Sequence, residues 1–384
     1  MNHFPRPTLA SAIADELTGK VVLSDAQNGL FLAGPRRTGK SQFLQTDLKP
    51  ELERRGMLVL YVDLWAAAAT SPMTQIATVL AQAVEDNVST VVKIAKRAGV
   101  DKIGVPGALA IDLAKIGKTD GMTLHQTLDV LRKATKKVIV LIVDEAQHAL
   151  TSEDGDTAMR ALKSARDQLK DGGEARFLLV MSGSHRDKLM RLLNSASAPF
   201  WGSLVRTLPP LGNDFAAYWT RFVREQKPEL GAVRQSVMEE AFEQVGHQPQ
   251  FFRDAIGTAL NASSDGTGFE AALLGSARQR RAAEREELTG TFLRLAPLQQ
   301  AVLQRLLEQG ESYRAFDAKA LAFYGKQTNA KVSVAQVQRA HDALRDNDPP
   351  LVWKSLRGDY SVYDQALTGW HAYLVGEKNW PPRK

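Results

Sequence analysis

The chain has 384 residues, of which 44% are hydrophobic, and a formal net charge of +6. This length allows two or three domains with ordinary hydrophobic cores. The sequence contains no cysteine, which excludes disulfide bonds and thiolate metal sites, and its 7 histidines show no metal-ligand spacing. A positive net charge permits nucleic-acid binding but does not by itself indicate it.

The sequence carries no sign of a membrane segment or an export signal. Its longest unbroken aliphatic run, residues 138–143, is far shorter than a membrane span. The first residues, MNHFPRPTLASAIADEL, lack the apolar stretch of a cleavable leader. We therefore expect a cytoplasmic protein that does not contact membranes.

The first informative element is a phosphate loop. A short capped helix is predicted over residues 8–18, and the apolar run at 30–33 predicts a buried parallel strand. Residues 34–41, GPRRTGKS, follow this strand and match the pattern G-x-x-x-x-G-K-[ST] in full. In that pattern, backbone N–H groups and the positive end of the next helix surround nucleotide phosphates. The segment therefore predicts a nucleotide site.

The residues expected to bind the nucleotide belong to this loop and the start of its helix. They are Gly34, Pro35, Arg36, Arg37, Thr38, Gly39, Lys40, Ser41 and Gln42. Lys40 would reach the β- and γ-phosphates, and the Ser41 hydroxyl would ligate Mg²⁺. The loop thus predicts a nucleoside triphosphate and Mg²⁺ as cofactors.

The next elements continue an alternation of strands and helices. Residues 58–63 predict a second buried strand, and Ser71-Pro72 would start a helix that runs to about residue 98. Residues 99–118 alternate in a way that predicts a short inserted hairpin, and leucine spacing predicts a helix over residues 123–135. Such alternation is typical of α/β proteins with a parallel sheet.

The second informative segment is VIVLIVDEAQH, residues 138–148. Its aliphatic half predicts a central strand buried on both faces. Asp144 at the strand end would hold the Mg²⁺ shell, and Glu145 would orient and deprotonate an attacking water. Acids at strand ends are often merely solvated. These lie about a hundred residues after a full phosphate loop, and the two motifs support each other.

Two further strands complete the predicted sheet. Residues 176–181 follow a predicted helix over 157–171 and end in Ser182-Gly183-Ser184. The Ser184 hydroxyl would contact the γ-phosphate or the attacking water, with a turn or helix cap as the plain alternative. The fifth strand is predicted over residues 204–208.

From residue 214 the pattern is helical, and residues 211–288 are interpreted as a helical lid. Gly246-His247-Gln248-Pro249 interrupts two of these helices at a place where backbone could meet an adenine base. The run RQRRAAER, residues 278–285, is basic but also contains one glutamate and precedes two more. Such a run is usually a solvated helix face, with nucleic-acid contact as the alternative.

The last predicted domain is a winged helix. Residues 298–307 predict an amphipathic helix, and Ser333 would cap a helix over residues 333–346. Two short strands, LVWKS and YSVYD, are joined by a turn at residues 356–359. In a winged helix, the helix before the hairpin is the recognition helix and the hairpin is the wing. Such domains contact DNA or proteins, and the modest basic content of this helix leaves both partners open.

Together these motifs resemble AAA+-type P-loop ATPases of the archaeal-ATPase kind, a group related to the STAND signal-transduction ATPases. The chain is also similar to origin-initiator and transposition-regulator ATPases. The resemblance rests on GPRRTGKS, VDEAQH, SGSHRDKLM, GHQP and the segment APFWG at residues 198–202. It implies a five-stranded parallel P-loop core in the order 5-1-4-3-2 and ATP rather than GTP as the nucleotide. It also implies a switch in which ATP holds the lid and winged helix in one arrangement.

The resemblance assigns roles to two further residues. Pro249 matches a lid proline that contacts adenine in related switch ATPases. The family pattern usually has an arginine after Trp201-Gly202 that reaches a neighbouring subunit's nucleotide, but Ser203 stands there in this chain. Arg206 is the nearest substitute, and a solvated strand residue is its plain alternative. Hydrolysis activated within an ATP-dependent homo-oligomer is therefore left open.

These interpretations divide the chain into a P-loop core (1–210), a helical lid (211–288), a winged helix (289–376) and a tail (377–384). The preferred function is an ATP-binding and ATP-hydrolysing switch that regulates an unidentified protein partner or a nucleic-acid process. One alternative is a loader or target selector that grips double-stranded DNA. The other is a nucleotide-binding scaffold without turnover, against which intact Lys40, Asp144 and Glu145 argue.

Overall fold

The computed structural model describes two compact units. The described residues are 3–34, 36–67, 69–87, 122–171, 174–184, 186–194, 198–201, 203, 205–263, 268–347, 349–354 and 358–383. The hairpin predicted over residues 99–118 and the far end of the helix predicted to reach residue 98 lie outside them. The core unit comprises residues 1–35 and 39–209, and the helical unit comprises residues 210–384 with residues 36–38.

The core unit is built on a five-stranded parallel sheet, which confirms the predicted α/β class and parallel sheet. Across the sheet the strands are β2 (Leu58–Asp63), β3 (Ile139–Asp144), β6 (Phe177–Gly183), β1 (Leu30–Ala33) and β7 (Val205–Thr207). Counted along the chain, these strands lie in the order 2-3-4-1-5. β6 extends beyond the strand predicted over 176–181 because Ser182 and Gly183 pair with Leu32 and Ala33 of β1.

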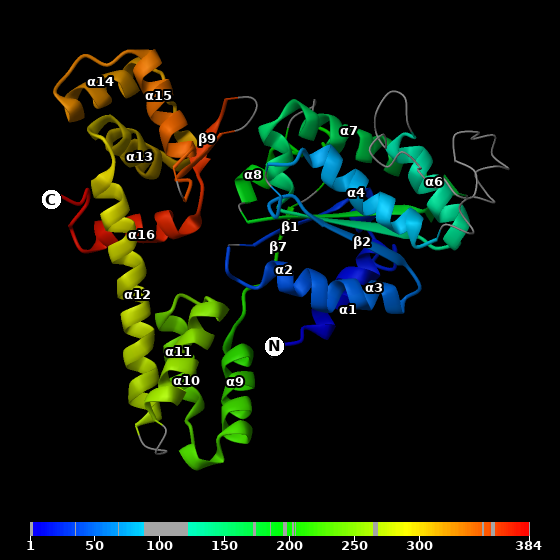
Figure 1. The fold of residues 1–384 in the computed structure, drawn as a ribbon, viewed down its shortest axis with the longest axis horizontal. Helices are drawn as coiled ribbons and strands as arrows, with labels where there is room; N and C mark the ends of the chain where they lie inside the picture. The colour runs from blue at the N-terminus through cyan, green and yellow to red at the C-terminus, as the bar shows by residue number, and fades with distance from the viewer. Residues whose placement is uncertain are drawn as a thin grey trace. The chain divides into compact units, whose positions relative to one another are not determined.

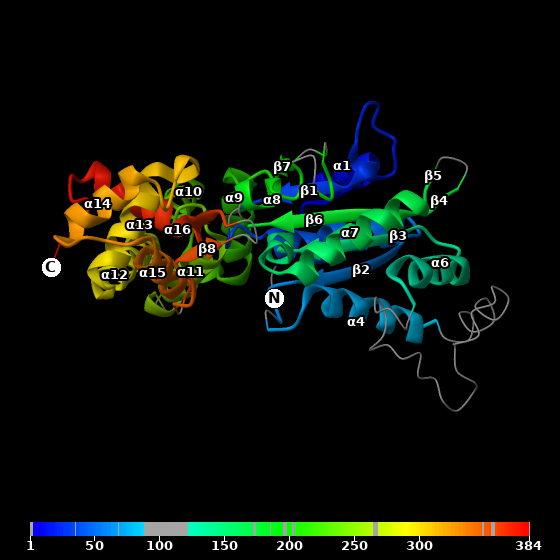
Figure 2. The same cartoon turned by 90° about the horizontal axis from the view of Figure 1, so that it is seen from above.

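Helices cover both faces of this sheet (Figures 1 and 2). α1 (Pro7–Leu17) and α3 (Lys49–Arg54) lie on one face, and α4 (Pro72–Glu85), α6 (Leu124–Thr135) and α7 (Glu153–Gln168) lie on the other. The shorter elements are η1 (Ala26–Asn28), η4 (Ala146–Thr151), α8 (Arg186–Met190) and the small hairpin of β4 (Lys170–Asp171) with β5 (Glu174–Ala175). The sequence did not predict that hairpin.

The packing of β3 shows why helices are needed on both faces. Every residue of β3 is buried. Ile139, Leu141 and Val143 pack in the cluster that contains α4, α6 and α7. Val140 and Ile142 pack in the cluster that contains α1 and α3, because successive side chains of a strand point to opposite faces. The unbroken aliphatic run in the sequence therefore reflects burial on both sides.

Local sequence signals set several helix ends in the core unit. The Ser71 hydroxyl accepts the Thr74 N–H at 3.2 Å and begins α4, as predicted. Thr123 and Gln126 form a capping box that satisfies free N–H groups at the start of α6. α6 ends where Lys136 adopts a left-handed conformation with φ of 58°.

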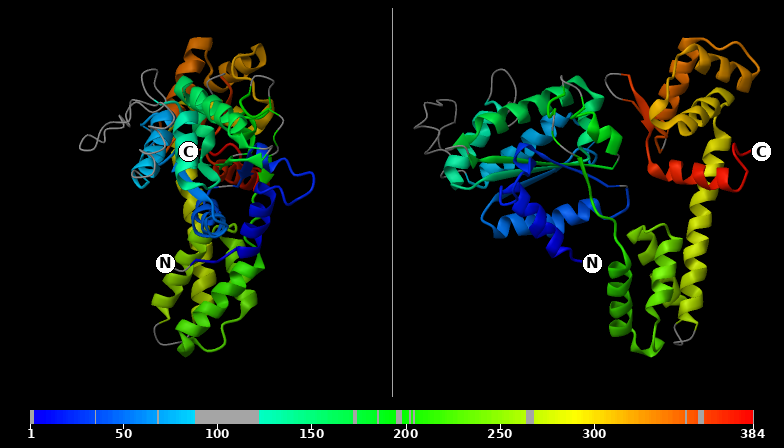
Figure 3. Two further views of the ribbon diagram at one scale, coloured as in Figure 1. Left: turned by 90° about the vertical axis from the view of Figure 1, so that its right-hand side faces the viewer. Right: turned by 180° about the vertical axis from the view of Figure 1, so that it is seen from behind.

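The helical unit begins with helices that pack along one long helix. They are α9 (Asn213–Gln226), the turn η5 (Pro228–Leu230), α10 (Gln235–Gln244), α11 (Pro249–Ala262) and α12 (Phe269–Arg294). α10 and α11 both contact α12, the long yellow helix of Figure 3. The rings of Phe215, Phe242 and Phe252 meet with centroids 4.9 to 5.9 Å apart and join α9 to α10 and α11. The boundary predicted at residue 288 falls inside α12.

The rest of the helical unit consists of helices and one antiparallel hairpin. Its elements are α13 (Pro297–Gln309), η6 (Gly310–Ser312), α14 (Ala318–Thr328), α15 (Val334–Arg345), β8 (Val352–Lys354), β9 (Tyr360–Val362) and α16 (Gln365–Gly376). Ser333 caps α15 by accepting the Gln336 N–H at 3.3 Å, which confirms that predicted helix start. A separate hydrophobic core that includes Tyr324, Leu344 and Trp370 holds these elements together.

None of the helices in the described parts of the chain has the length and apolar character needed to cross a membrane.

Candidate nucleotide site

The phosphate-loop motif connects β1 to a helix, as predicted. α2 (Lys40–Phe43) continues through the π-helical residues Leu44–Leu48 into α3. Gly39 precedes α2 with φ of 83°, a left-handed conformation that favours glycine. At Gly34, an added Cβ would lie 3.4 Å from the Leu208 Cβ, which is an ordinary van der Waals distance. Of these two glycines, Gly39 is therefore the one whose conformation requires glycine.

Lys40 is the centre of a buried polar cluster. Its Nζ lies 2.5 Å from Asp144 Oδ1, 3.0 Å from Glu145 Oε1 and 3.2 Å from Ser182 Oγ. The lysine is 4% exposed. Burial lowers the pKa of Lys40, but the Asp144 and Glu145 charges raise it more, and the pKa ends above its ordinary value. The lysine is therefore charged at neutral pH.

Asp144 is the last residue of β3 and is fully buried. It accepts hydrogen bonds from the Tyr61 hydroxyl at 3.0 Å, from the Ser182 hydroxyl and from the Glu145 N–H at 2.9 Å. Burial raises the pKa of Asp144, but the Lys40 charge and the hydrogen bonds lower it below its usual value. The carboxylate is thus ionised, although it lies in the protein interior.

The residues predicted to hold Mg²⁺ fit that ion. The Ser41 hydroxyl is within hydrogen-bonding reach of the Asp144 carboxylate, so the two predicted ligands are neighbours. Both offer oxygen atoms, which Mg²⁺ prefers, and proteins usually supply few such ligands to a Mg²⁺ that also binds phosphates. Ser41 and Asp144 could therefore hold the ion beside a nucleotide.

Glu145 begins a sharp turn out of the sheet. Its φ of 53° is left-handed, which is uncommon for a residue other than glycine and is often found at functional sites. Its Oε2 accepts from the Ser184 hydroxyl at 2.8 Å and from the Gln147 side-chain amide. Burial and the Asp144 charge raise the pKa of Glu145, but the Lys40 charge and the hydrogen bonds from Gln147 and Lys40 bring it below its usual value. The structure thus brings four predicted site residues together: Lys40, Asp144, Glu145 and Ser184.

Arg206 lies outside this cluster, on the edge strand β7. Its guanidinium is partly exposed and forms an ion pair with Glu16 of α1. Ser203, at the position where the family pattern has an arginine, donates its N–H to the Phe200 carbonyl at 3.2 Å. The role of Arg206 towards a neighbouring nucleotide stays a prediction.

The other predicted nucleotide contacts also stay predictions. Gln42 lies in α2, one residue after Ser41. Residues 36–38 group with the helical unit, and Pro35 lies outside the described residues. Pro249 is the first residue of α11 in the helical unit.

Sequence reasoning missed three side chains of the cluster: Tyr61, Gln147 and Ser182. Ser182 is a polar residue at the end of a buried strand, and Gln147 is a polar residue two positions after Glu145. Both lie in or beside motifs that the sequence singles out, so their polar character was the available signal. Tyr61 gave a weaker one, since a tyrosine in an otherwise aliphatic strand needs a partner for its hydroxyl.

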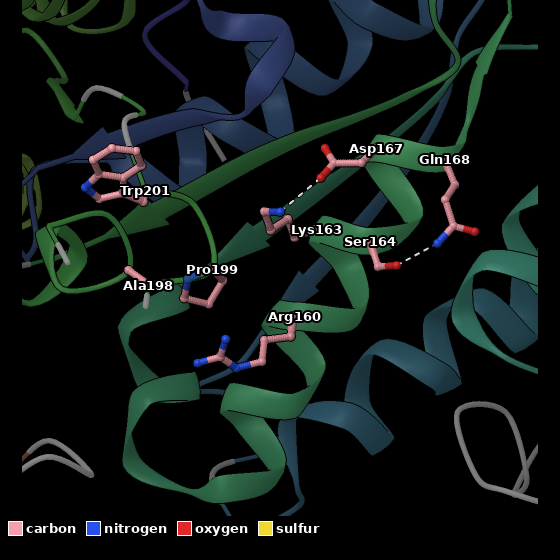
Figure 4. A pocket seen from close by; sticks show the side chains of 8 residues that line it. All are labelled: Arg160, Lys163, Ser164, Asp167, Gln168, Ala198, Pro199 and Trp201. Atoms are coloured by element: carbon pink, nitrogen blue, oxygen red, sulfur yellow. Dashed lines mark hydrogen bonds and ion pairs between the residues drawn. The ribbon is translucent and has the colours of Figure 1, made fainter. Parts of the chain in front are cut away.

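A pocket of about 630 Å³ lies elsewhere in the core unit, between α7 and residues 198–201 (Figure 4). Its wall includes Trp201, whose side chain is 67% exposed. Lys163 on α7 is paired with Asp167 at 3.1 Å, and Arg160 is paired with Asp156 at 2.7 Å. The pocket shares no residue with the Lys40 cluster, and its cations already have carboxylate partners.

A buried strand leads through a phosphate loop into a helix, and the lysine of the loop bonds two acids at the end of another strand of the same sheet. This combination defines a P-loop nucleoside triphosphatase domain. The family model described as the AAA domain matches residues 24–189. This part of the chain is therefore similar to the AAA domain of P-loop ATPases, as the motifs predict.

Two solved structures are similar to the chain over most of its length. The chain is similar to the Walker-type ATPase paby2304 of Pyrococcus abyssi, with 16% identity, coverage of 94% of each chain and a TM-score of 0.51. The ORC2 protein of Aeropyrum pernix, solved with ADPNP and ADP, is 16% identical over 97% of this chain and 94% of its own, with a TM-score of 0.46. No curated protein matches the chain in sequence. At such identities the first likeness shows a shared fold.

Proposed function

We propose that the chain binds and hydrolyses ATP and acts as a nucleotide-dependent switch on a partner protein. The observation that carries this proposal is the cluster in which Lys40 meets Asp144 and Glu145 within hydrogen-bonding distance. Each member is a residue type that phosphoryl transfer to water requires. These are a cation for the phosphates, a carboxylate for Mg²⁺ and a second carboxylate for the water.

In the proposed reaction, water attacks the γ-phosphate in line, and ADP leaves with inorganic phosphate as the other product. Lys40 would exchange its carboxylate partners for phosphate oxygens, which are equally good acceptors for an ammonium group. Glu145 would hold the water and accept its proton, while Ser184 would bond the γ-phosphate or the carboxylate. Mg²⁺ held by Ser41 and Asp144 would supply further positive charge when bound.

The arrangement of elements supports the proposed domains. Read from β7 inward, the sheet order corresponds to 5-1-4-3-2, the order implied by the resemblance to AAA+-type ATPases. The segment α13–α15 followed by the β8–β9 hairpin has the element order of a winged helix. We assign residues 1–210 to the ATPase core, 211–288 to the lid, 289–376 to the winged helix and 377–384 to a tail.

The charges on α15 favour a protein partner over DNA. The helix carries two arginines and one aspartate. Arg345 is engaged by Asp342 at 3.1 Å and by Asp346 at 2.7 Å, so half of the basic charge is already neutralised. Val334 at the start of the helix is 50% exposed. A helix that neutralises several DNA phosphates would present free cations instead.

The test is steady-state ATP turnover by the purified chain, with and without duplex DNA, at low and moderate salt. Lys40→Ala and Glu145→Gln are the matched inactive variants. Slow turnover that DNA does not change and that both variants lose supports the switch, and pull-downs with and without ATP should then find the partner. DNA stimulation that fades with salt would favour the loader or target selector. Tight ATP binding without turnover would favour the nucleotide-binding scaffold that does not hydrolyse ATP.

ATP-dependent assembly is part of the same proposal. Arg206 is the candidate for a residue that reaches a neighbouring nucleotide, and it would have to leave Glu16 to do so. Sedimentation of the chain with ADP and with a slowly hydrolysed ATP analogue tests assembly. An Arg206→Ala variant that assembles normally but turns over more slowly would support the finger role.

A further inference from the structure

We infer that Gln147 is a positioning residue for the water-activating carboxylate of Glu145. The inference rests on the proposed ATP hydrolysis and concerns a residue to which that proposal gives no role. Gln147 lies in η4, two residues after Glu145, and is 2% exposed. A side chain amide buried this deeply beside a reacting group needs a reason, because its polar atoms lose water.

The Gln147 amide nitrogen donates to two groups of the site. It bonds Glu145 Oε2 and lies 3.2 Å from Ser184 Oγ. The Ser184 hydroxyl donates to the same Glu145 Oε2 at 2.8 Å. The three side chains therefore form a closed triangle around one carboxylate oxygen.

The other Glu145 oxygen explains why this triangle matters during turnover. Glu145 Oε1 lies 3.0 Å from Lys40 Nζ. When Lys40 moves to the phosphates, Oε1 loses that partner and becomes the oxygen that can hold a water. The bonds from Gln147 and Ser184 to Oε2 would then keep the carboxylate from rotating away from the γ-phosphate.

The orientation of the amide supports a functional contact. A carboxylate accepts but cannot donate, so the amide must turn its nitrogen towards Glu145. Gln147 Oε1 is consequently buried without a hydrogen-bond partner among the residues that the structure describes. An unpaired buried carbonyl is unfavourable, so the interaction of the nitrogen with Glu145 outweighs it.

Gly183 of β6 makes the space for this amide. A Cβ added at Gly183 would lie 2.5 Å from Gln147 Oε1, which is too close for any real contact. Glycine inside a strand is otherwise unfavourable and often marks a close approach of another group. Any larger residue at position 183 would push the amide away from Glu145.

The first part of the test uses a substitution that preserves size and removes the donor. Gln147→Met in the full chain should lower kcat about tenfold or more and change KM for ATP by less than about twofold. The matched control is Gln75→Met. Gln75 is also buried in the core unit, but its amide donates to the Ala67 and Thr70 carbonyls at 3.1 and 2.9 Å. The control should keep the wild-type kcat.

The second part uses Gly183→Ala. Alone, this substitution should lower kcat about as much as Gln147→Met, because the new methyl group displaces the amide. Added to Gln147→Ala, it should cause no further loss, since nothing remains to be displaced. Thermal unfolding checks that each variant folds. If Gln147→Met does not fold, the comparison of Gly183→Ala with and without Gln147→Ala provides the test.

The outcomes separate this inference from the proposed function. Turnover by the wild type that Glu145→Gln abolishes establishes the function independently of Gln147. With that established, an unchanged kcat in Gln147→Met, an equal loss in Gln75→Met, or additive losses in the Gly183 and Gln147 pair would each overturn the positioning role. A wild-type chain that never turns over ATP would overturn the function, and the inference with it.

Discussion

The ammonium nitrogen of Lys40 lies 2.5 Å from Asp144 Oδ1, although the two residues are 104 positions apart in the chain. The two side chains are 4% and 0% exposed. Burying either charge alone would be very costly, so each remains ionised because the other is present. The stability of the core unit is thereby linked to the same residues that would bind and hydrolyse ATP.

Lys40→Ala should destabilise the core unit as well as abolish turnover. The substitution leaves Asp144 and Glu145 buried beside each other without a cation, which typically costs about 3–5 kcal/mol. Urea unfolding of the wild type and the variant measures the difference. Adding Asp144→Asn should recover part of the loss, because a neutral amide needs no counter-charge. A Lys40→Ala variant that unfolds at the wild-type urea concentration would contradict this account.

Gly155→Ala should destabilise the chain although alanine favours helices. Gly155 lies in the first turns of α7, and an added Cβ would sit 2.1 Å from the Ala149 carbonyl oxygen. We expect a loss of about 1–3 kcal/mol or more from this clash. The matched control is Gly275→Ala in α12, where nothing lies within 4 Å of the new methyl group. The control should gain about 0.5–1 kcal/mol, and equal effects at both sites in thermal unfolding would refute the steric argument.

The stability of the segment from α13 to α16 should depend on pH through His341. This residue is fully buried; its Nδ1 lies 2.8 Å from the Val337 carbonyl, and its Nε2 lies 2.7 Å from the Tyr313 hydroxyl. Burial lowers the pKa of His341 to about 4, whereas the pKa of a histidine in the unfolded chain is about 6.5. Between these values the unfolded chain binds the proton and the folded chain does not.

The stabilisation from neutral His341 is therefore complete above about pH 6.5 and falls by about 3 kcal/mol as the pH approaches 4. Urea unfolding at several pH values between 7 and 4.5 measures this slope. His341→Gln removes the titrating group and should therefore reduce the slope of unfolding free energy against pH for the helical unit. An unchanged slope in this variant would assign the pH dependence to other groups.

Tyr61→Phe should lower ATP turnover at low concentrations of Mg²⁺. The Tyr61 hydroxyl donates to Asp144 Oδ2 at 3.0 Å and helps to hold the carboxylate in place. Loss of such a supporting bond commonly costs about 10–100-fold in metal affinity or activity. The Mg²⁺ concentration for half-maximal ATP turnover should rise accordingly, while kcat at saturating Mg²⁺ recovers. A variant with the wild-type Mg²⁺ titration would show that Asp144 is held well enough by its other partners.

The elements that carry the main residues of the candidate site were predictable from the sequence, because these residues lie in short motifs with local geometry. The apolar run at residues 30–33 predicts a strand, and GPRRTGKS predicts a turn and a helix that starts at Lys40. The structure has the strand and the helix, with a left-handed Gly39 just before the helix. The aliphatic run before Asp144 specified a strand buried on both faces. The helix starts at Ser71 and Ser333 were predictable for the same reason, since a capping side chain bonds backbone groups within one helical turn.

Other features were beyond sequence reasoning because they depend on contacts between distant segments. Gln147 follows Glu145 in the chain, but its contact with Ser184 and the space at Gly183 exist only because η4 folds back onto β6. The extension of β6 through Ser182 follows from its register with β1. α12 also continues past the boundary predicted at residue 288, and Phe292 near its end packs in the core of the elements that follow.

The sequence by itself determined which residue types would stand at the candidate nucleotide site, since a phosphate loop and an acid pair are each made of consecutive residues. The tertiary structure alone decided which neighbours would hold them. Tyr61 contacts Asp144 because β2 and β3 run parallel in a register that pairs Asp63 with Asp144. Ser182 and Ser184 contact the acids because β6 lies beside β3. Sheet order and register arise from the packing of the whole core, and no single segment encodes them.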